Sequence, residues 1–212
     1  MRPGALLAAF LLIAAPGILA AAPALAGGRP GAFDFYVLSL SWSPTYCATD
    51  RSPDPVQCAT PRAFIVHGLW PQYENGFPSD CPSNMPRRVS QGIVNGLSDI
   101  MPGAGLVNHE WQKHGLCSGL NQADYFATLR RASEAVTLPA NLTGRSLAPR
   151  QIEQAFIAAN PRMTQTGIAV VCNRGLLQEV RICLTKELGF RRCLDVDRRG
   201  CHVPEIRVPA GH

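Results

Sequence analysis

Residues 109–117, which read HEWQKHGLC, concentrate side chains that handle protons or charge. In a helix, Glu110, Lys113 and His114 stand at positions i, i+3 and i+4, so they share one face. That face would bring a carboxylate, an ammonium and an imidazole close together. His109 lies four residues before Lys113 and joins the same neighbourhood. Groups of these types at this spacing favour acid–base chemistry and the stabilisation of negative charge.

The two histidines of this segment do not have the spacing of a zinc site. The zinc protease signature H-E-x-x-H places its imidazoles four residues apart on one helical face. His109 and His114 are five residues apart, which separates them by roughly 140° around a helix. We therefore expect no metal ion and no cofactor here.

A second segment, FIVHGLWP at residues 64–71, holds another of the five histidines. The apolar run 63–67 predicts a short strand, so His67 would stand at a strand end, where a side chain enters a cleft from a rigid support. Trp70 offers a flat surface on which a base could stack. The alternatives are a hydrogen-bonded core histidine for His67 and an ordinary core residue for Trp70.

Two imidazoles on separate rigid elements suit a reaction in which one proton is removed and another is delivered. Free histidine titrates at roughly pH 6.5, so one ring can be neutral while the other is charged. The ammonium of Lys113 could stabilise charge on phosphate oxygens, and the carboxylate of Glu110 could orient its neighbours. Without a metal, this set favours cleavage of RNA by the substrate's own 2′-hydroxyl.

The strands that would hold these segments lie at both ends of the chain. Apolar residues on both faces predict a buried central strand at 33–42, ended by Pro44. Further strands are predicted at 167–172, 176–185 and, as a short edge, 205–208. In the strand 176–185, Glu179 and Arg181 fall on the polar face of a clean alternation.

The helices are expected between these strands. They are predicted at 90–100, across HEWQKH as far as Gly115, at 124–136 and at 149–159, whereas 45–61 and 74–86 have loop composition. This order predicts a single α+β domain: a mainly antiparallel central sheet flanked by helices and stapled by disulfides.

Residues 1–26 have the pattern of an export signal. Arg2 supplies the positive start, and the run 5–15 is almost wholly apolar. Small residues end the segment at Ala26, as a cleavage site requires. An uncleaved membrane anchor is the alternative, but the apolar run is shorter than the ~20 residues of a spanning helix. We expect a mature domain at 27–212 that is periplasmic or secreted and makes no membrane contact after cleavage.

The charge of the chain is mildly basic. The formal net charge is +5 at pH 7 and falls to +4 when Arg2 is removed. This balance is compatible with an anionic partner but does not identify one. Only two lysines occur, Lys113 and Lys186, so a lysine within the charged segment stands out. The mature length suffices for one domain with a sizeable core, and we expect a monomer.

The cysteines indicate an oxidising compartment. All eight follow the predicted signal: Cys47, Cys58, Cys81, Cys117, Cys172, Cys183, Cys193 and Cys201. An even count behind an export signal predicts four disulfides. Metal binding is the alternative, but no C-x-x-C pair occurs. Many pairings are open, and local loop closure favours Cys47 with Cys58 and Cys183 with Cys193.

Taken together, FIVHGLWP and HEWQKHGLC resemble the two active-site segments of the ribonuclease T2 family, which are secreted acid endoribonucleases. The order and separation of the segments, the preceding stretch YVLSLSWSPTYC and the cysteine positions also fit, over residues 33–201. The resemblance implies metal-independent cleavage of single-stranded RNA with low base specificity. The product would be a 2′,3′-cyclic phosphate, later hydrolysed to a 3′-phosphate.

The resemblance also implies a role for each matching position. His114 would be the general base on the 2′-hydroxyl, and His67 the general acid on the leaving 5′-oxygen. Glu110 and Lys113 would stabilise the pentacoordinate phosphate. His109 would help to bind phosphate, and Trp70 would stack on a base.

Two further features follow from the resemblance. The family pattern pairs the cysteines matching Cys81 with Cys117, and Cys172 with Cys201. Gln72, at a substrate-binding position, stands where some members carry an aspartate that contributes to base choice, so base preference stays open.

Two other functional classes compete with the endoribonuclease. A catalytically silent RNA-binding protein on the same scaffold would lack His67 or His114, and both are present. A zinc-dependent hydrolase is opposed by the five-residue histidine spacing, and insensitivity to chelator would distinguish it from the endoribonuclease.

Overall fold

The computed structural model describes residue 1 and residues 28–210. The predicted export signal, apart from Met1, lies outside the described residues. Within the described part, no helix is both long and apolar enough to cross a membrane.

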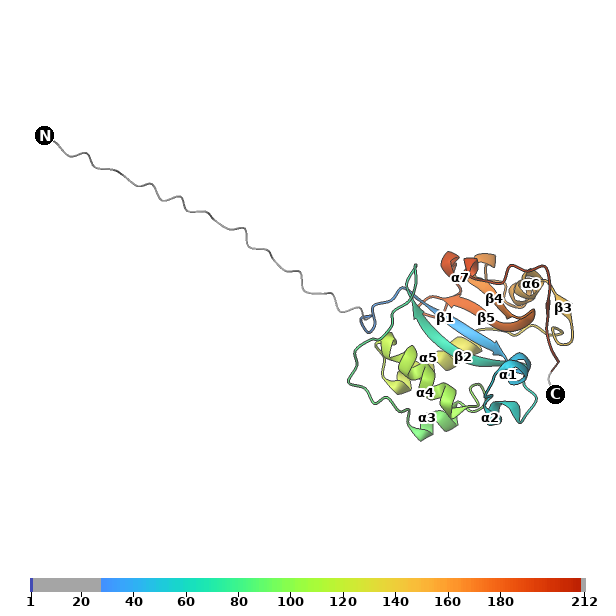
Figure 1. Cartoon of the computed structure of the whole chain (residues 1–212), viewed down its shortest axis with the longest axis horizontal. Helices are drawn as coiled ribbons and strands as arrows, with labels where there is room; N and C mark the ends of the chain where they lie inside the picture. Colours follow the sequence, from blue (N-terminus) through green and yellow to red (C-terminus); the bar gives the residue numbers. More distant parts are fainter. Residues whose placement is uncertain (2–27, 211–212) are drawn as a thin grey trace.

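The core of the fold is a six-stranded sheet, drawn in Figure 1 with helices around it. Its strand order is β2-β1-β5-β6-β3, and β4 pairs with β5 as well. Every pairing is antiparallel except that between β5 and β6. The predicted α+β architecture with a mainly antiparallel sheet is therefore confirmed. The strands are β1 (Phe35–Trp42), β2 (Phe64–Gln72), β3 (Ser146–Leu147), β4 (Ile168–Asn173), β5 (Leu176–Leu184) and β6 (Ile206–Arg207).

The sheet separates two hydrophobic cores of unequal size, because β1 is apolar on both faces. Tyr36, Leu38 and Leu40 enter the larger core, to which α3, α4, α5 and α6 contribute. Phe35 and Val37 enter the smaller core, together with Ala169, Cys183, Cys193 and Val196, and Trp70 packs against this smaller cluster. A strand that is buried on both faces reads as a continuous apolar run.

Seven α-helices and two 3₁₀ turns lie within residues 28–210. Figure 1 shows α3, α4 and α5 gathered beside β1 and β2, whereas α6 and α7 lie near β4. The helices are α1 (Ser43–Thr49), α2 (Pro55–Cys58), α3 (Gln91–Gly96), α4 (Ala104–Lys113), α5 (Gln122–Glu134), α6 (Pro149–Ala159) and α7 (Leu194–Arg198), with 3₁₀ turns at Gly115–Ser118 and Gln165–Gly167.

Several helix boundaries differ from the prediction. The expected loop 45–61 contains α1 and α2, because a proline occupies the first turn of each helix and the fixed φ of proline suits that position. Asp54 caps α2 by accepting hydrogen bonds from the backbone N–H groups of Val56 and Gln57, at 2.8 and 3.1 Å. The helix predicted at 90–100 ends at Gly96, and the helix that carries HEWQKH begins at Ala104 and ends at Lys113, short of the predicted Gly115.

Four disulfides staple the domain. The pairs are Cys47–Cys58, Cys81–Cys117, Cys172–Cys201 and Cys183–Cys193. Cys81–Cys117 ties the loop after β2 to the 3₁₀ turn that follows α4. Cys183–Cys193 closes the segment between β5 and α7, and both of its sulfurs lie in the smaller core. These links fix the elements that carry the two motifs.

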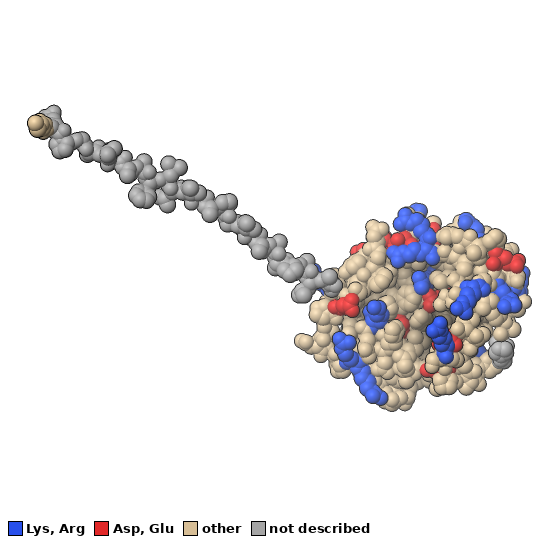
Figure 2. Space-filling model, viewed as in Figure 1, with Lys and Arg blue, Asp and Glu red and all other residues tan. Residues whose placement is uncertain are grey.

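Charged side chains are distributed over the surface. Figure 2 shows Lys and Arg side chains spread across the viewed face, with acidic groups between them. Several of the arginines are paired, including Arg130 with Asp99 and Arg191 with Glu74. Local groups, rather than one broad basic surface, therefore set the electrostatics of a site on this face.

Candidate active site

His67 lies inside a strand and not at its end as predicted, because β2 continues to Gln72. The register with β1 changes at this point: Gly68 opposes Ser39, whereas Val66 opposes Leu40. His67 is the extra residue of a β-bulge, a feature that commonly re-aims a side chain beside an active site.

The bulge places His67 and Trp70 on one face of the sheet. In a regular strand, residues three apart point to opposite faces. Here the two rings lie edge to face with centroids 5.4 Å apart. Trp70 opposes Val37 and packs on the smaller core. The bulge therefore brings the chemistry of the first motif together on the side of the smaller core.

Glu110 of α4 reaches this face of β2 through the space above Gly68. Its Oε2 accepts a 2.7 Å hydrogen bond from Trp70 Nε1, and its Oε1 lies 3.4 Å from His67 Nε2. A side chain at position 68 would overlap the carboxylate of Glu110. The glycine is required here because the carboxylate approaches its backbone closely. Glu110 is 1% exposed and lies between both histidines.

His114 completes the cluster from the C-terminus of α4. It is the C-cap, with φ −124° and ψ −44°, so the regular helix has already ended. Its Nε2 lies 4.0 Å from Glu110 Oε2, and its ring stacks on Trp70 with centroids 5.1 Å apart. His109 and Lys113, from the same helix, are exposed. The structure therefore brings together His67, Trp70, Glu110 and His114, with the two cations of α4 presented to solvent.

Burial and nearby charges shift the pKa values of His67 and His114 in opposite directions. Burial lowers the pKa of His67, but the hydrogen bond to Glu179 and the charges of Glu110 and Glu179 outweigh it, so this pKa lies above its ordinary value. Burial, aided by the positive charges of His67, His109 and Lys113, lowers the pKa of His114 to about 3. At mildly acidic pH, His67 therefore carries a proton and His114 is neutral.

The pKa of Glu110 is raised, whereas the pKa of a carboxylate paired with a cation is usually lowered. Burial raises its pKa to about 7, against the opposing effects of His67 and of the Trp70 hydrogen bond. Below that pH the group is a neutral acid. It can then donate a proton or a hydrogen bond to an oxygen in the cleft.

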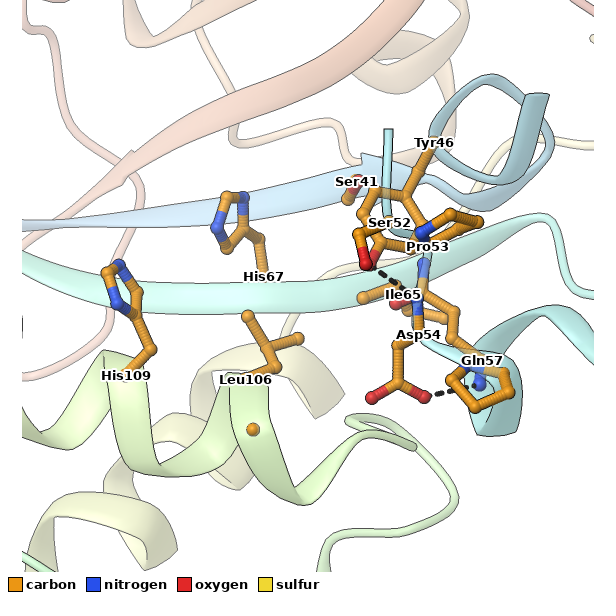
Figure 3. A pocket seen from close by; sticks show the side chains of 12 residues that line it. Ser41, Tyr46, Ser52, Pro53, Asp54, Gln57, Ile65, His67, Leu106 and His109 are labelled. Carbon is orange, nitrogen blue, oxygen red and sulfur yellow. Dashed lines mark hydrogen bonds between the residues drawn. The ribbon is translucent and has the colours of Figure 1, made fainter. Parts of the chain in front are cut away.

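Two hollows open on either side of this cluster. The first, here called the His109 hollow, has a volume of about 470 Å³ and is lined by Ser41, Tyr46, Asp54, Gln57, His67 and His109 among others. Figure 3 shows His67 on β2 and His109 on α4 at one end of it, with Tyr46 and Asp54 at the other. The second, the Trp70 hollow, has a volume of about 190 Å³ and is lined by Val37, Trp70, Gln72, Phe77, His114 and Arg181 among others.

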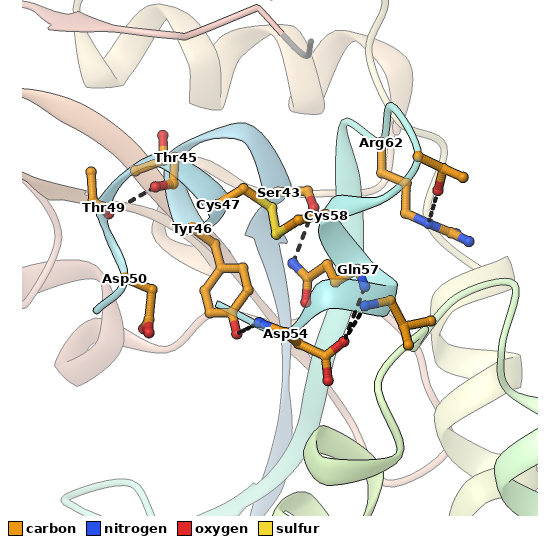
Figure 4. The surroundings of a disulfide bond; sticks show 12 residues. Ser43, Thr45, Tyr46, Cys47, Thr49, Asp50, Asp54, Gln57, Cys58 and Arg62 are labelled. Atoms are coloured by element: carbon orange, nitrogen blue, oxygen red, sulfur yellow. Dashed lines mark hydrogen bonds between the residues drawn. A yellow bond between two sulfur atoms is a disulfide. The ribbon is translucent and has the colours of Figure 1, made fainter. Parts of the chain in front are cut away.

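The far wall of the His109 hollow is held by the Cys47–Cys58 disulfide. Figure 4 shows this bridge beside Tyr46, whose hydroxyl accepts a 2.8 Å hydrogen bond from the backbone N–H of Asp54. Gln57 Nε2 donates to Ser43 Oγ at 3.0 Å. The disulfide and these bonds make a rigid wall from a segment with loop-like composition.

The sequence pattern of the ribonuclease T2 family matches residues 33–193.

The chain belongs to the ribonuclease T2 family.

The relatives of this ribonuclease include bacterial enzymes. A ribonuclease of Aeromonas hydrophila is 35% identical over 170 residues, which cover 76% of each chain. A probable ribonuclease of Haemophilus influenzae is also 35% identical, over 76% of this chain and 61% of its own. Family membership and these relatives identify the chain as an RNA-cleaving endoribonuclease.

Solved ribonuclease structures share the fold. RNase NT, solved in complex with 5′-AMP, is 26% identical with a TM-score of 0.63, and the match covers 84% of this chain and 98% of that one. Ribonuclease MC1 from the seeds of bitter gourd is 20% identical with a TM-score of 0.65, over 82% of this chain and 100% of its own. The second likeness shows the fold alone.

Sequence reasoning missed one group that touches His67, a histidine of the candidate site. Glu179 Oε1 lies 2.7 Å from His67 Nδ1. The alternation of β5 assigned Glu179 to a polar face, but the residue is only 5% exposed, and its carboxylate is enclosed by contacts with His67 and Arg181. A carboxylate on an interior strand was the available signal, and it required knowing the strand order.

Replacing Glu110 by glutamine should stabilise the fold at pH 8. The carboxyl binds its proton more tightly in the folded state, with a pKa of about 7, so deprotonation above the unfolded pKa progressively destabilises the folded chain. Glutamine does not titrate, so it removes this pH dependence of the stability. Since one pKa unit corresponds to about 1.4 kcal/mol, the gain over wild type should grow by about 3 kcal/mol between pH 4 and pH 8. Urea unfolding at pH 4 and pH 8 measures the free energy of unfolding of both proteins. An equal difference between variant and wild type at the two pH values would contradict the raised pKa of Glu110.

Proposed function

We propose that this chain cleaves single-stranded RNA without a metal, by transphosphorylation to a 2′,3′-cyclic phosphate and then hydrolysis to a 3′-phosphate. The observation that carries the proposal is geometric: the imidazoles of His67 and His114 stand on either side of buried Glu110, in surroundings that shift their pKa values in opposite directions. Such a pair provides an acid and a base at the same pH.

In the first step, neutral His114 accepts the proton of the 2′-hydroxyl while the 2′-oxygen forms a bond to phosphorus. The bond from phosphorus to the 5′-oxygen breaks, and protonated His67 delivers its proton to that oxygen from Nε2. Negative charge grows on the phosphate oxygens in the transition state. Neutral Glu110 and the ammonium of Lys113 stabilise this charge, and His109 binds the phosphate.

In the second step, water takes the place of the departed 5′-hydroxyl. His67, now neutral, removes a proton from water, and His114 returns its proton to the 2′-oxygen as the cyclic bond breaks. Each histidine thus recovers its starting state after one full cycle, and no metal enters either step.

The two hollows support a substrate with unpaired bases and a low base specificity. A base on each side of the scissile phosphate can leave the stack and enter a hollow, which a duplex does not permit without unpairing. Gln72, at the Trp70 hollow, donates from Nε2 to the Pro71 carbonyl at 3.0 Å. Its amide has both a donor and an acceptor, so it suits more than one base edge.

The decisive experiment uses purified mature protein, a short defined RNA and excess chelator, followed by mass analysis of the ends. Fragments with 2′,3′-cyclic phosphate ends are expected. A matched RNA with one 2′-deoxynucleotide at the main cleavage position should stay intact there, because it lacks the nucleophile. Cleavage that requires added zinc would refute the metal-free mechanism. Binding without cleavage would favour a catalytically silent RNA-binding protein.

The pH profile of kcat/KM should be broad and centred in the acidic range. Activity requires neutral His114, so it falls only as pH approaches the pKa of about 3. It also requires protonated His67 and neutral Glu110, so it falls as pH rises through the raised pKa of His67 and through the pKa of Glu110, about 7. Initial rates on a dinucleotide from pH 3 to pH 9 measure both limbs. A rise in rate between pH 5 and pH 7 would show that His114 titrates as an ordinary imidazole.

Trp70 should contribute to substrate binding by stacking. Replacement by alanine should weaken RNA binding by about 5- to 150-fold, since stacking on a base is worth about 1–3 kcal/mol. Phenylalanine keeps an aromatic face and removes the Nε1 donor to Glu110. Affinity for an uncleavable 2′-deoxy substrate, measured by fluorescence anisotropy, compares the two variants. Unchanged affinity with lost stability in the alanine variant would mean that Trp70 is only a core residue.

We also propose that the protein is exported. The signal-like pattern of residues 1–26 and the four disulfides support a periplasmic or secreted protein whose mature domain is 27–212. Disulfides form and persist in oxidising compartments. Mass analysis of protein recovered from the periplasm or medium would locate the cleavage point, expected after Ala26.

A further inference from the structure

Glu179 is a buried carboxylate to which the reaction steps above assign no role. It sits on β5, opposite Ser41 of β1 and Val171 of β4. Its Oε1 lies 2.7 Å from His67 Nδ1. Its Oε2 accepts two hydrogen bonds from Arg181, from Nε at 3.1 Å and from a terminal nitrogen at 2.9 Å. Both oxygens of Glu179 are therefore engaged.

These contacts continue around the active site. The guanidinium of Arg181 lies over the ring of Trp70, 5.1 Å from its centroid. Trp70 donates to Glu110, and Glu110 lies 3.4 Å from the other nitrogen of His67. The closed ring of contacts runs from His67 through Glu179, Arg181, Trp70 and Glu110 back to His67.

We propose that Glu179 is the positioning residue for His67, and that Arg181 holds Glu179 in place as a carboxylate. The proposal rests on the proposed function, because it concerns the residue that protonates the leaving oxygen. Glu179 binds the Nδ1–H of His67, so the other nitrogen, Nε2, carries the proton that is delivered to the substrate.

These contacts also determine the pH range in which His67 is protonated. The groups that face His67 are Glu179 and Arg181 from β5, with Glu110, His109 and His114 from α4. Burial alone would favour the neutral ring. Glu179 opposes this effect at hydrogen-bond distance. Burial raises the pKa of Glu179 itself, but the contacts with His67 and Arg181 outweigh it and keep Glu179 charged.

The test compares two substrates in the mature enzyme. One is a dinucleotide, whose leaving alkoxide needs a proton. The other is a nucleoside 3′-(p-nitrophenyl phosphate), whose leaving phenolate does not. Glu179→Ala should lower kcat on the dinucleotide by about 10- to 100-fold, by analogy with carboxylates that orient the histidine ligands of metal sites. Its KM should change less than threefold. On the p-nitrophenyl ester, its kcat should stay within about threefold of wild type, because no acid is required.

His114→Ala supplies the opposite pattern, since loss of the base should slow both substrates alike. Glu179→Gln keeps the shape and an acceptor for Nδ1–H but loses the charge. This variant should move the alkaline limb of kcat/KM, and the NMR titration of His67, to lower pH. Glu153→Gln, a half-buried carboxyl on α6 that accepts from the backbone of Val170, is the matched control and should move neither.

Several outcomes would overturn the proposal. One is a Glu179→Ala variant that slows both substrates equally, which would indicate a general structural defect. Another is an unmoved His67 titration in a folded Glu179→Gln variant. Failure of the proposed function has a different signature: wild type would then yield no cyclic phosphate, or His67→Ala would retain full activity on the dinucleotide.

Discussion

Alanine at His114 or at His67 is expected to lower kcat/KM on RNA by about 10³- to 10⁴-fold, with the fold unchanged. General acid–base groups contribute about 10²–10⁴-fold each. These two act in one concerted transfer, so the double variant should be little worse than either single variant. Steady-state rates on a dinucleotide at pH 5 measure the effect. The melting temperature should stay at or above that of wild type for His114→Ala, since that ring is neutral and desolvated in the folded state.

His202 provides the matched control for these variants. It is exposed, and its Nε2 lies 2.9 Å from the carbonyl oxygen of Arg198, outside the cluster. His202→Ala should retain the activity of wild type. Near-normal activity in either His67→Ala or His114→Ala would refute the two-histidine mechanism, whatever the state of the control.

Alanine at Gly68 is expected to reduce activity by about 100-fold although no polar atom is removed. The new methyl group would overlap the carboxylate of Glu110 and crowd Trp70 Nε1. The bond between these two groups must then lengthen, and a displacement of about 1 Å at a reacting centre can cost about 10²-fold. Overpacking should also cost about 1–3 kcal/mol of stability. Kinetics at pH 5 and urea unfolding measure the two effects.

Gly92 is the control for this substitution. It lies in α3, where an added Cβ meets no atom within 4 Å. Gly92→Ala should leave activity unchanged and raise helix stability slightly, by up to about 1 kcal/mol. Wild-type kinetics in a folded Gly68→Ala variant would mean that Glu110 and Trp70 can separate without consequence for the reaction.

The sequence predicted five of the six strands and the longer helices because their signals are local. It missed β3, and β6, predicted as a short edge strand, lies between β5 and β3. The strand 33–42 is apolar on both faces, which only a central strand can bury. The helix at 149–159 has proline in its first turn and ends before Asn160, and its observed bounds are Pro149–Ala159. The helices α1 and α2 were missed because they are short. Both have a proline in the first turn, and α2 has the Asp54 cap, but neither is long enough to show an amphipathic period.

The site was predictable as a set of residues but not as an arrangement. Two motifs indicated His67, Trp70, Glu110 and His114. The bulge at His67 has no signal in the pattern of β2, so the strand was predicted to end there. Glu179 was assigned to a polar face for a similar reason. Which face of a strand is buried depends on its neighbours, and these are fixed by pairings with residues far away in the chain.

The unequal cores on the two sides of the sheet have a consequence for how this scaffold can evolve. Each motif contains residues that pack in the core and residues to which the proposed chemistry is assigned. Val66, Leu69 and Trp111 anchor the larger core, whereas the proposed acid His67, the proposed base His114 and Trp70 lie outside it. Stability and chemistry therefore reside in different residues of the same short segments. A duplicated gene can lose the histidines, keep the anchors and still encode a folded protein, free to acquire a task other than cutting RNA.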